Sequence, residues 1–304
     1  QILYTVRRLP RPDQVPHLKW VQLHMAGVDL ILKDPLYLER PEITFTSASG
    51  VHTRQLAQFS LMMMMAFHFK LKRMIEHQQN RAWRDDRMNP HALFAPQDLH
   101  LQTVGIAGNG TIGRELARLA KAIGMTVLAT KRDVMHPEQS PDDYSPAGTG
   151  DPTGDLADRL YPSEALGVMA RDCDYLVNLL PMTDKTRGTI SAEVIAAMKP
   201  SAVLINVGRG GVVDEVALIE ALKNGRLGGA ARDVFETEPL PPSSPFWRME
   251  NVIVSPHKSR GTIAWIVVGG IRREITSCLI RSALSFQRRV NGGQRERNFA
   301  LNSA

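Results

Sequence analysis

The sequence predicts an α/β fold built on parallel sheets, and three observations support it. Short apolar runs typical of buried strands, at 104–107, 175–180 and 202–206, alternate with segments of helical periodicity, at 192–198 and 215–224. This alternation is typical of strand–helix–strand units, which place their strands parallel. The first unit has a glycine-rich turn between its strand and its helix. The chain has 304 residues, which is enough for two such domains.

The segment from Val104 to Arg132 has the pattern of a dinucleotide-binding unit. Gly108 permits a tight turn after the first strand, Gly110 lets the backbone approach a pyrophosphate, and Gly113 lets the helix pack close to that strand. The helix N-terminus then offers unpaired N–H groups and a positive dipole end to the phosphates. Because the glycines are flanked by the right strand and helix, the motif favours a nucleotide site over a structural turn.

The end of the second strand of this unit predicts a preference for NADP over NAD. NAD-binding units usually place an acidic residue there, about 20 residues past the glycines, to bind the ribose hydroxyls. This chain has Lys131 and Arg132 instead, and two cations suit a 2′-phosphate. The alternative is that both side chains lie in solvent and that Asp133 serves the ribose.

The composition excludes several classes of protein. The net charge is +6 and the pI is about 9.5, but the cations are dispersed, aromatic residues are few and no nucleic-acid module is present. No apolar run reaches the length of a membrane span, and no metal-ligand spacing stands out. Two cysteines, Cys173 and Cys278, are too few for a disulfide framework, which fits a reducing cytoplasm.

Other segments can be assigned more coarsely. We expect a strand at Leu18–Leu23 and a long helix at Gln55–Ile75, whose run Met62–Met65 favours a core or dimer-contact helix over a membrane surface. The prolines of Asn89–Gln97 indicate a linker. Pro137–Thr153 is rich in Pro, Gly, Ser and Asp, which predicts a mobile surface excursion.

An ordered set of motifs resembles the D-isomer-specific 2-hydroxyacid dehydrogenase family, which includes glyoxylate/hydroxypyruvate reductases and phosphoglycerate dehydrogenases. The resemblance runs from about Leu18 to about Leu284. Besides the glycine unit, it rests on the following stretches: HMAGVD at 24–29, LLPMTDKTRG at 179–188, INVGRGGVVDEVAL at 205–218, GAARDVFETEPLP at 229–241 and NVIVSPHK at 251–258.

Three residues in these motifs have the chemistry that reduction of a 2-oxo acid needs. Arg209 lies on an open turn after a strand, and its planar fork suits a carboxylate. His257 follows the short strand Val252–Val254 and is the natural proton donor, and Glu238 would orient its imidazole. The resemblance assigns the same three catalytic positions. Glu236 competes with Glu238, which we favour because it directly precedes a proline, as in the family.

The resemblance also implies the cofactor and substrate contacts. The backbone N–H groups of Thr111 and Ile112 would bind the pyrophosphate. Leu180 and Pro181 would line the adenosine, with Thr186 as an outer polar contact. Val207 would lie near the nicotinamide, and Asp233 would accept from its carboxamide. The loops that hold the substrate carboxylate would contain Gly27, Gly50 and Val51.

Several residues depart from the family pattern. His52 and Gln58 stand where many relatives have Asn and Glu, and Arg232 stands where a small apolar residue is common. Lys258 and Arg260 add charge around His257. Relatives usually carry another strand–helix unit before the segment that resembles Gln1–Thr5, so we expect this lobe to lack its first unit.

The resemblance implies a Rossmann cofactor domain, residues 99–259, inserted in a flavodoxin-like substrate domain, residues 1–98 and 260–304. The implied function is hydride transfer between NAD(P)H and a small 2-oxo acid or D-2-hydroxy acid, in a cytoplasmic homodimer. One alternative is a nucleotide-sensing scaffold, as in corepressors that retain this fold. Another is a formate-type dehydrogenase, against which Glu238 argues, since that position is usually Gln there. The sequence identifies neither the 2-oxo acid nor the physiological direction.

Overall fold

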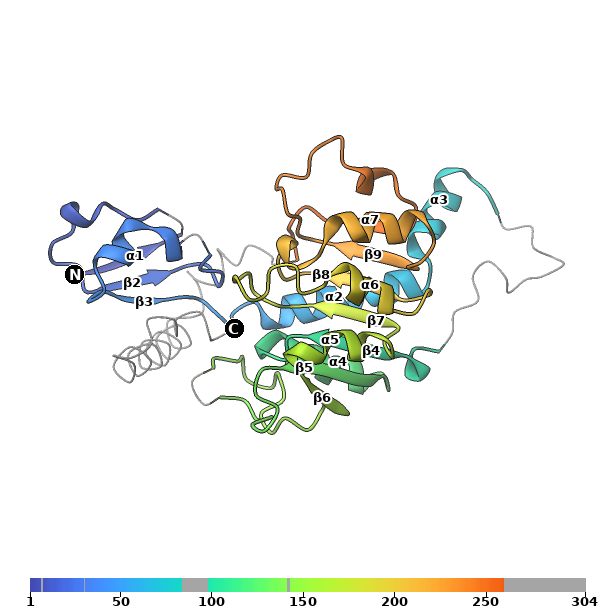
Figure 1. Ribbon diagram of the computed structural model, residues 1–304, viewed down its shortest axis with the longest axis horizontal. Helices are drawn as coiled ribbons and strands as arrows, with labels where there is room; N and C mark the ends of the chain where they lie inside the picture. The colour runs from blue at the N-terminus through green and yellow to red at the C-terminus, as the bar shows by residue number, and fades with distance from the viewer. Residues whose placement is uncertain (7, 30, 84–97, 141–142, 260–304) are drawn as a thin grey trace. The chain divides into compact units, whose positions relative to one another are not determined.

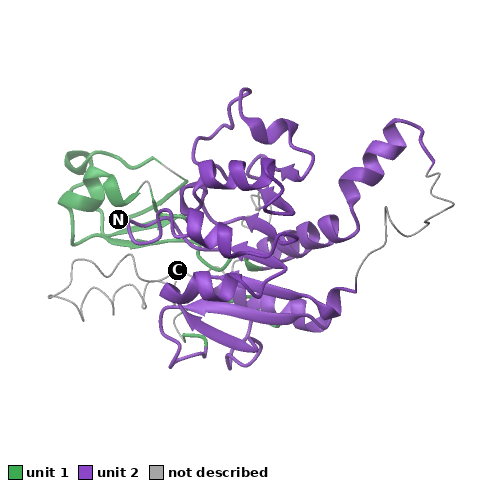
Figure 2. Ribbon diagram, turned by 45° about the vertical axis from the view of Figure 1, so that its right-hand side comes forward, with its two compact units in different colours: residues 1–53, 139–149, 261–304 green, residues 54–138, 150–260 purple. Residues whose placement is uncertain are grey.

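The computed structural model describes residues 1–6, 8–29, 31–83, 98–140 and 143–259. Contacts divide the described residues into two compact units, coloured separately in Figure 2: those within 1–53 and 139–149 belong to unit 1, and those within 54–138 and 150–259 belong to unit 2. The expected linker at 89–97 lies outside the described residues. The C-terminal segment from residue 260 onward, which was expected to belong to the substrate domain, also lies outside them.

Unit 1 contains a small parallel sheet in the order β1-β2-β3, formed by Ile2–Thr5, Trp20–Leu23 and Thr44–Thr46. The short helix α1, Pro35–Glu39, begins at Asp34, whose carboxylate accepts from the Leu36 N–H. A core packs around this sheet, with the buried members Leu18, Val21, Leu23, Ile31, Leu36, Ile43 and Phe45. The expected strand at 18–23 is therefore confirmed, beginning two residues later.

Unit 2 is built on a fully parallel sheet in the order β10-β9-β8-β7-β4-β5-β6, most of which can be followed in Figure 1. Its strands are β4 Thr103–Ala107, β5 Thr126–Lys131, β6 Arg159–Pro162, β7 Tyr175–Asn178, β8 Val203–Asn206, β9 Gly229–Arg232 and β10 Val252–Val254. The chain reverses its direction of travel across the sheet between β4 and β7. This is the doubly wound order of a Rossmann domain, and it confirms the predicted α/β class with parallel sheets.

Both faces of this sheet are covered. Side chains alternate along the strands, so Leu176 and Leu204 lie in one core while Val177 and Ile205 lie in the other. The first core also receives residues of α5 Leu166–Ala170, α6 Ala192–Ala197 and α7 Glu215–Lys223; the second receives residues of α2 Thr53–His68 and α4 Thr111–Ala122. Burial on both faces explains why the central strands β7 and β8 are apolar runs rather than alternating ones.

The single helix expected at Gln55–Ile75 is wrong, because the structure has two helices there. Lys70 adopts a left-handed conformation, with φ of 54°, which ends α2 and starts α3, Leu71–Gln79. Of these two helices, α2 packs on the sheet through Met63 and Met64, whereas α3 has no buried residue. Helical periodicity continues through the break, and no glycine or proline marks it, so no local pattern predicts it.

Residues 54–83 group with the large sheet by contact, although they precede the predicted domain boundary at 98/99. The Nζ atom of Lys72 donates to the carbonyl oxygens of Met249, at 2.6 Å, and Val252, at 3.1 Å, which ties α3 to the start of β10. A domain is defined by independent folding as well as by contact, so the boundaries at 98/99 and 259/260 stay a prediction.

The excursion at Pro137–Thr153 is anchored at both ends to α4. Arg114 is 3% exposed and donates to the carbonyl oxygens of Pro137, Glu138 and Asp151 at 2.7–2.9 Å. The Glu115 carboxylate accepts from the Gly150 N–H at 2.7 Å.

Within the part of the chain that is described, no helix combines the length and the apolar character that crossing a membrane requires.

Candidate active site

The sequence-predicted residues of unit 2 gather at one edge of its sheet. Because all seven strands are parallel, their carboxyl ends share that edge. The glycine turn follows β4, Lys131 ends β5, and Leu180 follows β7. The turns after β8, β9 and β10 contain the three expected catalytic residues, Arg209, Glu238 and His257. Ligands of open α/β sheets bind outside this edge, where the strand order reverses.

The turn after β4 depends on its glycines and leaves the N-terminus of α4 open. Gly108 has φ of 101°, a conformation that side chains disfavour. A Cβ added to Gly113 would lie 2.4 Å from the Gly108 oxygen, so only glycine lets the helix approach this closely. Gly110 is the N-cap of α4 and supplies no side-chain cap, which leaves the N–H groups of Thr111 and Ile112 at an open helix end.

Asn109, between two of these glycines, was not foreseen. It is 4% exposed, and neither Nδ2 nor Oδ1 of its side chain has a hydrogen-bond partner among the described residues. A buried amide without partners is costly, and such groups occur where a ligand or a water completes the bonding. Together with the open helix end, this orphaned amide fits a turn that binds a dinucleotide. A polar residue inside the glycine motif was the available sequence signal.

The cations after β5 differ in their surroundings. The Lys131 ammonium donates to the carbonyl oxygens of His136 and Glu138, so it closes a turn of its own loop. Arg132 is exposed. Asp133, the alternative ribose ligand, lies 2.7 Å from Nδ1 of His136, and this hydrogen bond raises the pKa of the histidine. Leu180 lies beside the glycine turn, 3.1 Å from where a Gly108 Cβ would be.

Two fully buried amides shape the turns after β7 and β8. Asn178 Nδ2 donates to Asn206 Oδ1 at 2.9 Å, and Asn206 Nδ2 donates to the Arg209 carbonyl at 3.1 Å. The Arg209 side chain donates from Nη1 to the Gly208 carbonyl at 2.9 Å. A Cβ on Gly210 would lie 1.9 Å from the Phe235 carbonyl carbon, so the turn with Arg209 touches the turn that leads to Glu238.

Glu238 and His257 come together from the turns after β9 and β10. Nδ1 of His257 lies 2.7 Å from Oε2 of Glu238, and Oε1 of Glu238 accepts from the Phe235 N–H at 2.9 Å. The side chains are 28% and 35% exposed, respectively. Glu236, the rival carboxylate, instead faces Arg187 at 3.8 Å. The geometry therefore pairs the imidazole with the carboxylate that the sequence favoured.

Asp233 fixes the turn that contains His257. Its side chain is buried, and Oδ1 accepts from Ser255 Oγ at 2.6 Å and from the Lys258 N–H at 2.7 Å, while Oδ2 accepts from the Ser259 N–H at 3.1 Å. His257 has φ of 55° within this turn. The sequence did not predict this bonding, and the contact of Asp233 with a nicotinamide carboxamide stays a prediction.

The remaining predicted contact residues lie in separate turns of the two units. Thr186 Oγ1 donates to the Pro181 carbonyl at 2.6 Å, and Val207 is 6% exposed after β8. In unit 1, Gly27 follows β2, and Gly50 and Val51 follow β3. Gly50 has φ of 88°, and a Cβ there would lie 2.1 Å from the Tyr144 oxygen, so this loop requires glycine. Within the described residues, no three His, Cys, Asp or Glu side chains are arranged to hold a metal ion.

Known proteins match this arrangement. Residues 61–259 match the model of the D-isomer specific 2-hydroxyacid dehydrogenase NAD binding domain. A glyoxylate reductase of Thermococcus gammatolerans is 30% identical over 276 residues, which cover 90% of this chain and 75% of that protein.

Two solved structures resemble this chain along most of its length. An NADPH-dependent glyoxylate/hydroxypyruvate reductase of Sinorhizobium meliloti, in complex with NADP and sulfate, has a TM-score of 0.71 at 29% identity, covering 90% of this chain and 80% of that one. A D-isomer specific 2-hydroxyacid dehydrogenase of Xanthobacter autotrophicus, in complex with NADPH and MES, has a TM-score of 0.70 at 28% identity, covering 97% and 83%. The chain therefore belongs to the D-isomer specific 2-hydroxyacid dehydrogenase family and is an NAD(P)-dependent oxidoreductase of that family.

Proposed function

We propose that the protein reduces a small 2-oxo acid of the glyoxylate or hydroxypyruvate type to the D-2-hydroxy acid. One observation carries this proposal: the hydrogen-bonded pair of His257 and Glu238 stands at the carboxyl edge of a dinucleotide-binding sheet, where Arg209 also lies. The names of the relatives support the same substrate class, since the matched Thermococcus protein is a glyoxylate reductase and the matched Sinorhizobium protein a glyoxylate/hydroxypyruvate reductase.

In this proposal Arg209 binds the substrate carboxylate and polarises the neighbouring carbonyl. Glu238 accepts from Nδ1 of His257, so Nε2 is the ring nitrogen that exchanges a proton with substrate. Protonated His257 donates from Nε2 to the carbonyl oxygen during reduction, and neutral His257 takes the hydroxyl proton in the reverse direction. A bound nicotinamide would supply the hydride. The N–H groups of Thr111 and Ile112 would hold its pyrophosphate.

We propose NADP as the preferred cofactor. Arg132 is exposed at the end of β5 and suits a 2′-phosphate, while the carbonyl contacts of Lys131 hold the turn beside it. The Sinorhizobium and Xanthobacter structures, which contain NADP and NADPH, support this preference.

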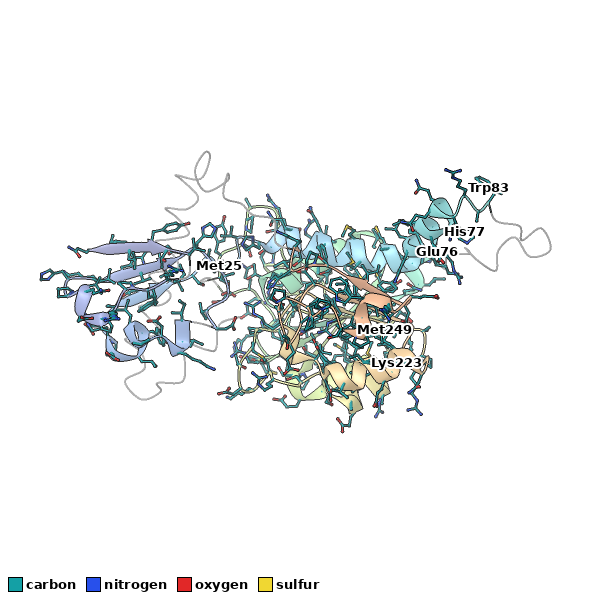
Figure 3. All side chains as sticks on the ribbon, turned by 90° about the horizontal axis from the view of Figure 1, so that it is seen from above. Met25, Glu76, His77, Trp83, Lys223 and Met249 are labelled. Atoms are coloured by element: carbon teal, nitrogen blue, oxygen red, sulfur yellow. The ribbon has the colours of Figure 1, made fainter. Side chains whose placement is uncertain are left out.

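We further propose a homodimer that associates through α3. Large apolar side chains on and beside this helix are exposed, and Trp83, at 93%, is the most exposed of them; Figure 3 shows it beyond the helix that contains Glu76 and His77. The others are Phe69, Leu71, Met74 and Ile75, at 41–46%. Clustered exposed apolar residues are typical of an interface.

We also propose a cytoplasmic location. Cys173 is buried and forms no disulfide, which fits a reducing compartment.

The test is a panel of 2-oxo acids assayed with NADPH and with NADH, and of formate with both oxidised cofactors. Reduction of glyoxylate or hydroxypyruvate that is lowered by about 10²–10⁴-fold in the variant His257→Ala supports the proposal. Nucleotide binding without turnover of any 2-oxo acid would instead identify a nucleotide-sensing scaffold. Equal Michaelis constants for NADH and NADPH would reject the cofactor preference, and a monomer in analytical ultracentrifugation would reject the dimer.

A further inference from the structure

A buried arginine stands at the start of the turn that leads to the proposed catalytic pair. Arg232 ends β9, and its side chain is 0% exposed. Burying a cation is unfavourable unless its partners are well placed, so the contacts of Arg232 indicate what the charge does.

Those contacts hold the start of the turn that follows β9. Nε and Nη2 of Arg232 donate to the Val234 carbonyl at 3.2 and 3.1 Å, and Nη2 also donates to Oε1 of Glu215, the first residue of α7. The guanidinium carbon lies 5.2 Å from the ring centres of both Phe235 and Phe246. The cation is thus fixed between two aromatic rings, a carboxylate and a backbone carbonyl.

The same carboxylate holds the next part of the turn. Oε1 of Glu215 accepts from the Glu236 N–H at 2.8 Å as well as from Arg232. Between these points, the Phe235 N–H donates to Glu238 at 2.9 Å, and Glu238 in turn contacts His257 at 2.7 Å. A continuous series of hydrogen bonds and ring contacts therefore joins the buried ion pair to the imidazole.

We propose that Arg232 is a positioning residue for proton transfer: together with Glu215, it fixes the turn at 234–238 so that Glu238 holds the imidazole of His257 in its reactive orientation. The chemical part rests on the proposed function, whereas the coupling between Arg232 and His257 rests on the contacts alone. The competing explanation is that Arg232 only fills space. In that case an apolar residue of similar volume should replace Arg232 without a change in kcat or in folding. Stability alone does not require the charge, because buried ion pairs often contribute little net stability.

The experiment compares Arg232→Leu, Arg232→Lys, Glu215→Gln and the double variant Arg232→Leu/Glu215→Gln with the intact enzyme. Arg226→Leu is the matched control, because Arg226 is exposed after α7 and its loss removes the same charge. The measurements are kcat and KM for the best 2-oxo acid, the solvent deuterium isotope effect on kcat, the dissociation constant of NADPH, and the NMR signal of the His257 Nδ1 proton, assigned by its absence in His257→Ala.

For Arg232→Leu we expect kcat to fall by about 10- to 100-fold, the scale of a misplaced catalytic group. The solvent isotope effect should rise, the dissociation constant of NADPH should stay within about twofold, and the His257 proton signal should shift or broaden. Arg232→Lys keeps the charge without the planar fork and should give an intermediate kcat. Glu215→Gln should lower kcat less than Arg232→Leu, and the two effects should be non-additive in the double variant.

Unchanged kcat, isotope effect and His257 signal in Arg232→Leu, relative to Arg226→Leu, would overturn the proposal. If Arg232→Leu does not fold, Arg232→Lys and Glu215→Gln decide it by the same measurements. The NMR signal separates the two levels of the argument. A shifted signal in an enzyme that reduces no 2-oxo acid would support the coupling and reject the proposed reaction. A constant signal in an active enzyme would reject the coupling alone.

Discussion

Nδ1 of His257 lies 2.7 Å from Oε2 of Glu238, although the residues are 19 positions apart and follow different strands. With the carboxylate on Nδ1, the imidazole is fixed in one tautomer and Nε2 is left for chemistry. Replacing His257 by Ala should lower kcat by about 10²–10⁴-fold, with nucleotide binding retained. Steady-state kinetics and NADPH titration check this, and near-normal kcat would remove His257 from the mechanism.

Glu238→Gln should lower kcat more than it changes KM, because the amide keeps the shape of the side chain but can donate to Nδ1 and so favour the wrong tautomer. A corresponding change in serine proteases lowers kcat by about 10⁴-fold. Glu238 is 35% exposed, and water can substitute in part, so we expect about 10²-fold. The control is Glu236→Gln, whose carboxylate faces Arg187. Equal losses in both variants would contradict the assignment of Glu238.

Arg132→Ala should weaken NADPH binding by about 10- to 100-fold and leave NADH binding nearly unchanged, because one charge-assisted contact to a phosphate contributes about 1.5–3 kcal/mol. The difference should shrink at high salt, since Arg132 is exposed. Fluorescence titration with both reduced cofactors measures it. Lys223→Ala removes a cation from the last turn of α7 and serves as the control. A parallel loss for NADH would show that Arg132 does not read the 2′-phosphate.

Asn109→Leu should stabilise the nucleotide-free protein and weaken its response to nucleotide. The amide of Asn109 is buried without partners among the described residues, and removing such a group relieves about 1–3 kcal/mol. The thermal midpoint without nucleotide should therefore rise, while its increase on adding NADPH should shrink. Differential scanning calorimetry with and without NADPH gives both values. A lower midpoint without nucleotide would indicate that the amide already has a partner, such as an ordered water.

Glu115→Gln should destabilise the protein at neutral pH, and the loss should disappear in acid. The Glu115 side chain is 2% exposed; burial opposes its ionisation, but bonds from Arg118 and the Gly150 N–H outweigh this and hold the pKa of the carboxyl below its ordinary value of 4.5. A lowered pKa adds stability above the unfolded value, which is lost as pH falls through the folded value.

Urea denaturation at a series of pH values measures this effect. At pH 7 the variant should be about 1.5–3 kcal/mol less stable, and the two curves should converge below pH 4.5, the ordinary value of the carboxyl. Glu220→Gln, on the exposed side of α7, should show no such pH dependence. A constant gap at all pH values would mean that Glu115 acts through its shape rather than its charge.

The sequence predicted the central part of the fold because its signals are local. The glycine turn, the helix after it and the strand at Val252–Val254 depend on backbone freedom, helical spacing and short apolar runs, and all three were predicted nearly to the residue. The strand Gly229–Arg232 was not predicted as one, since Gly, Ala and Arg have weak strand preference and only burial between β8 and β10 makes it a strand. The break between α2 and α3 at Lys70 was also missed, because no local sequence signal marks it.

By itself, the sequence determined the family, the parallel α/β class and the residue types of the candidate site, since motif order and periodicity lie along the chain. Only the tertiary structure decided which groups meet: that Glu238 rather than Glu236 contacts His257, that Asp233 bonds the turn around His257, and that the charge of Arg232 is buried. Such pairings depend on how parallel strands bring distant turns to one edge and on which polar groups lose water there. Neither is encoded in the spacing of residues along the chain.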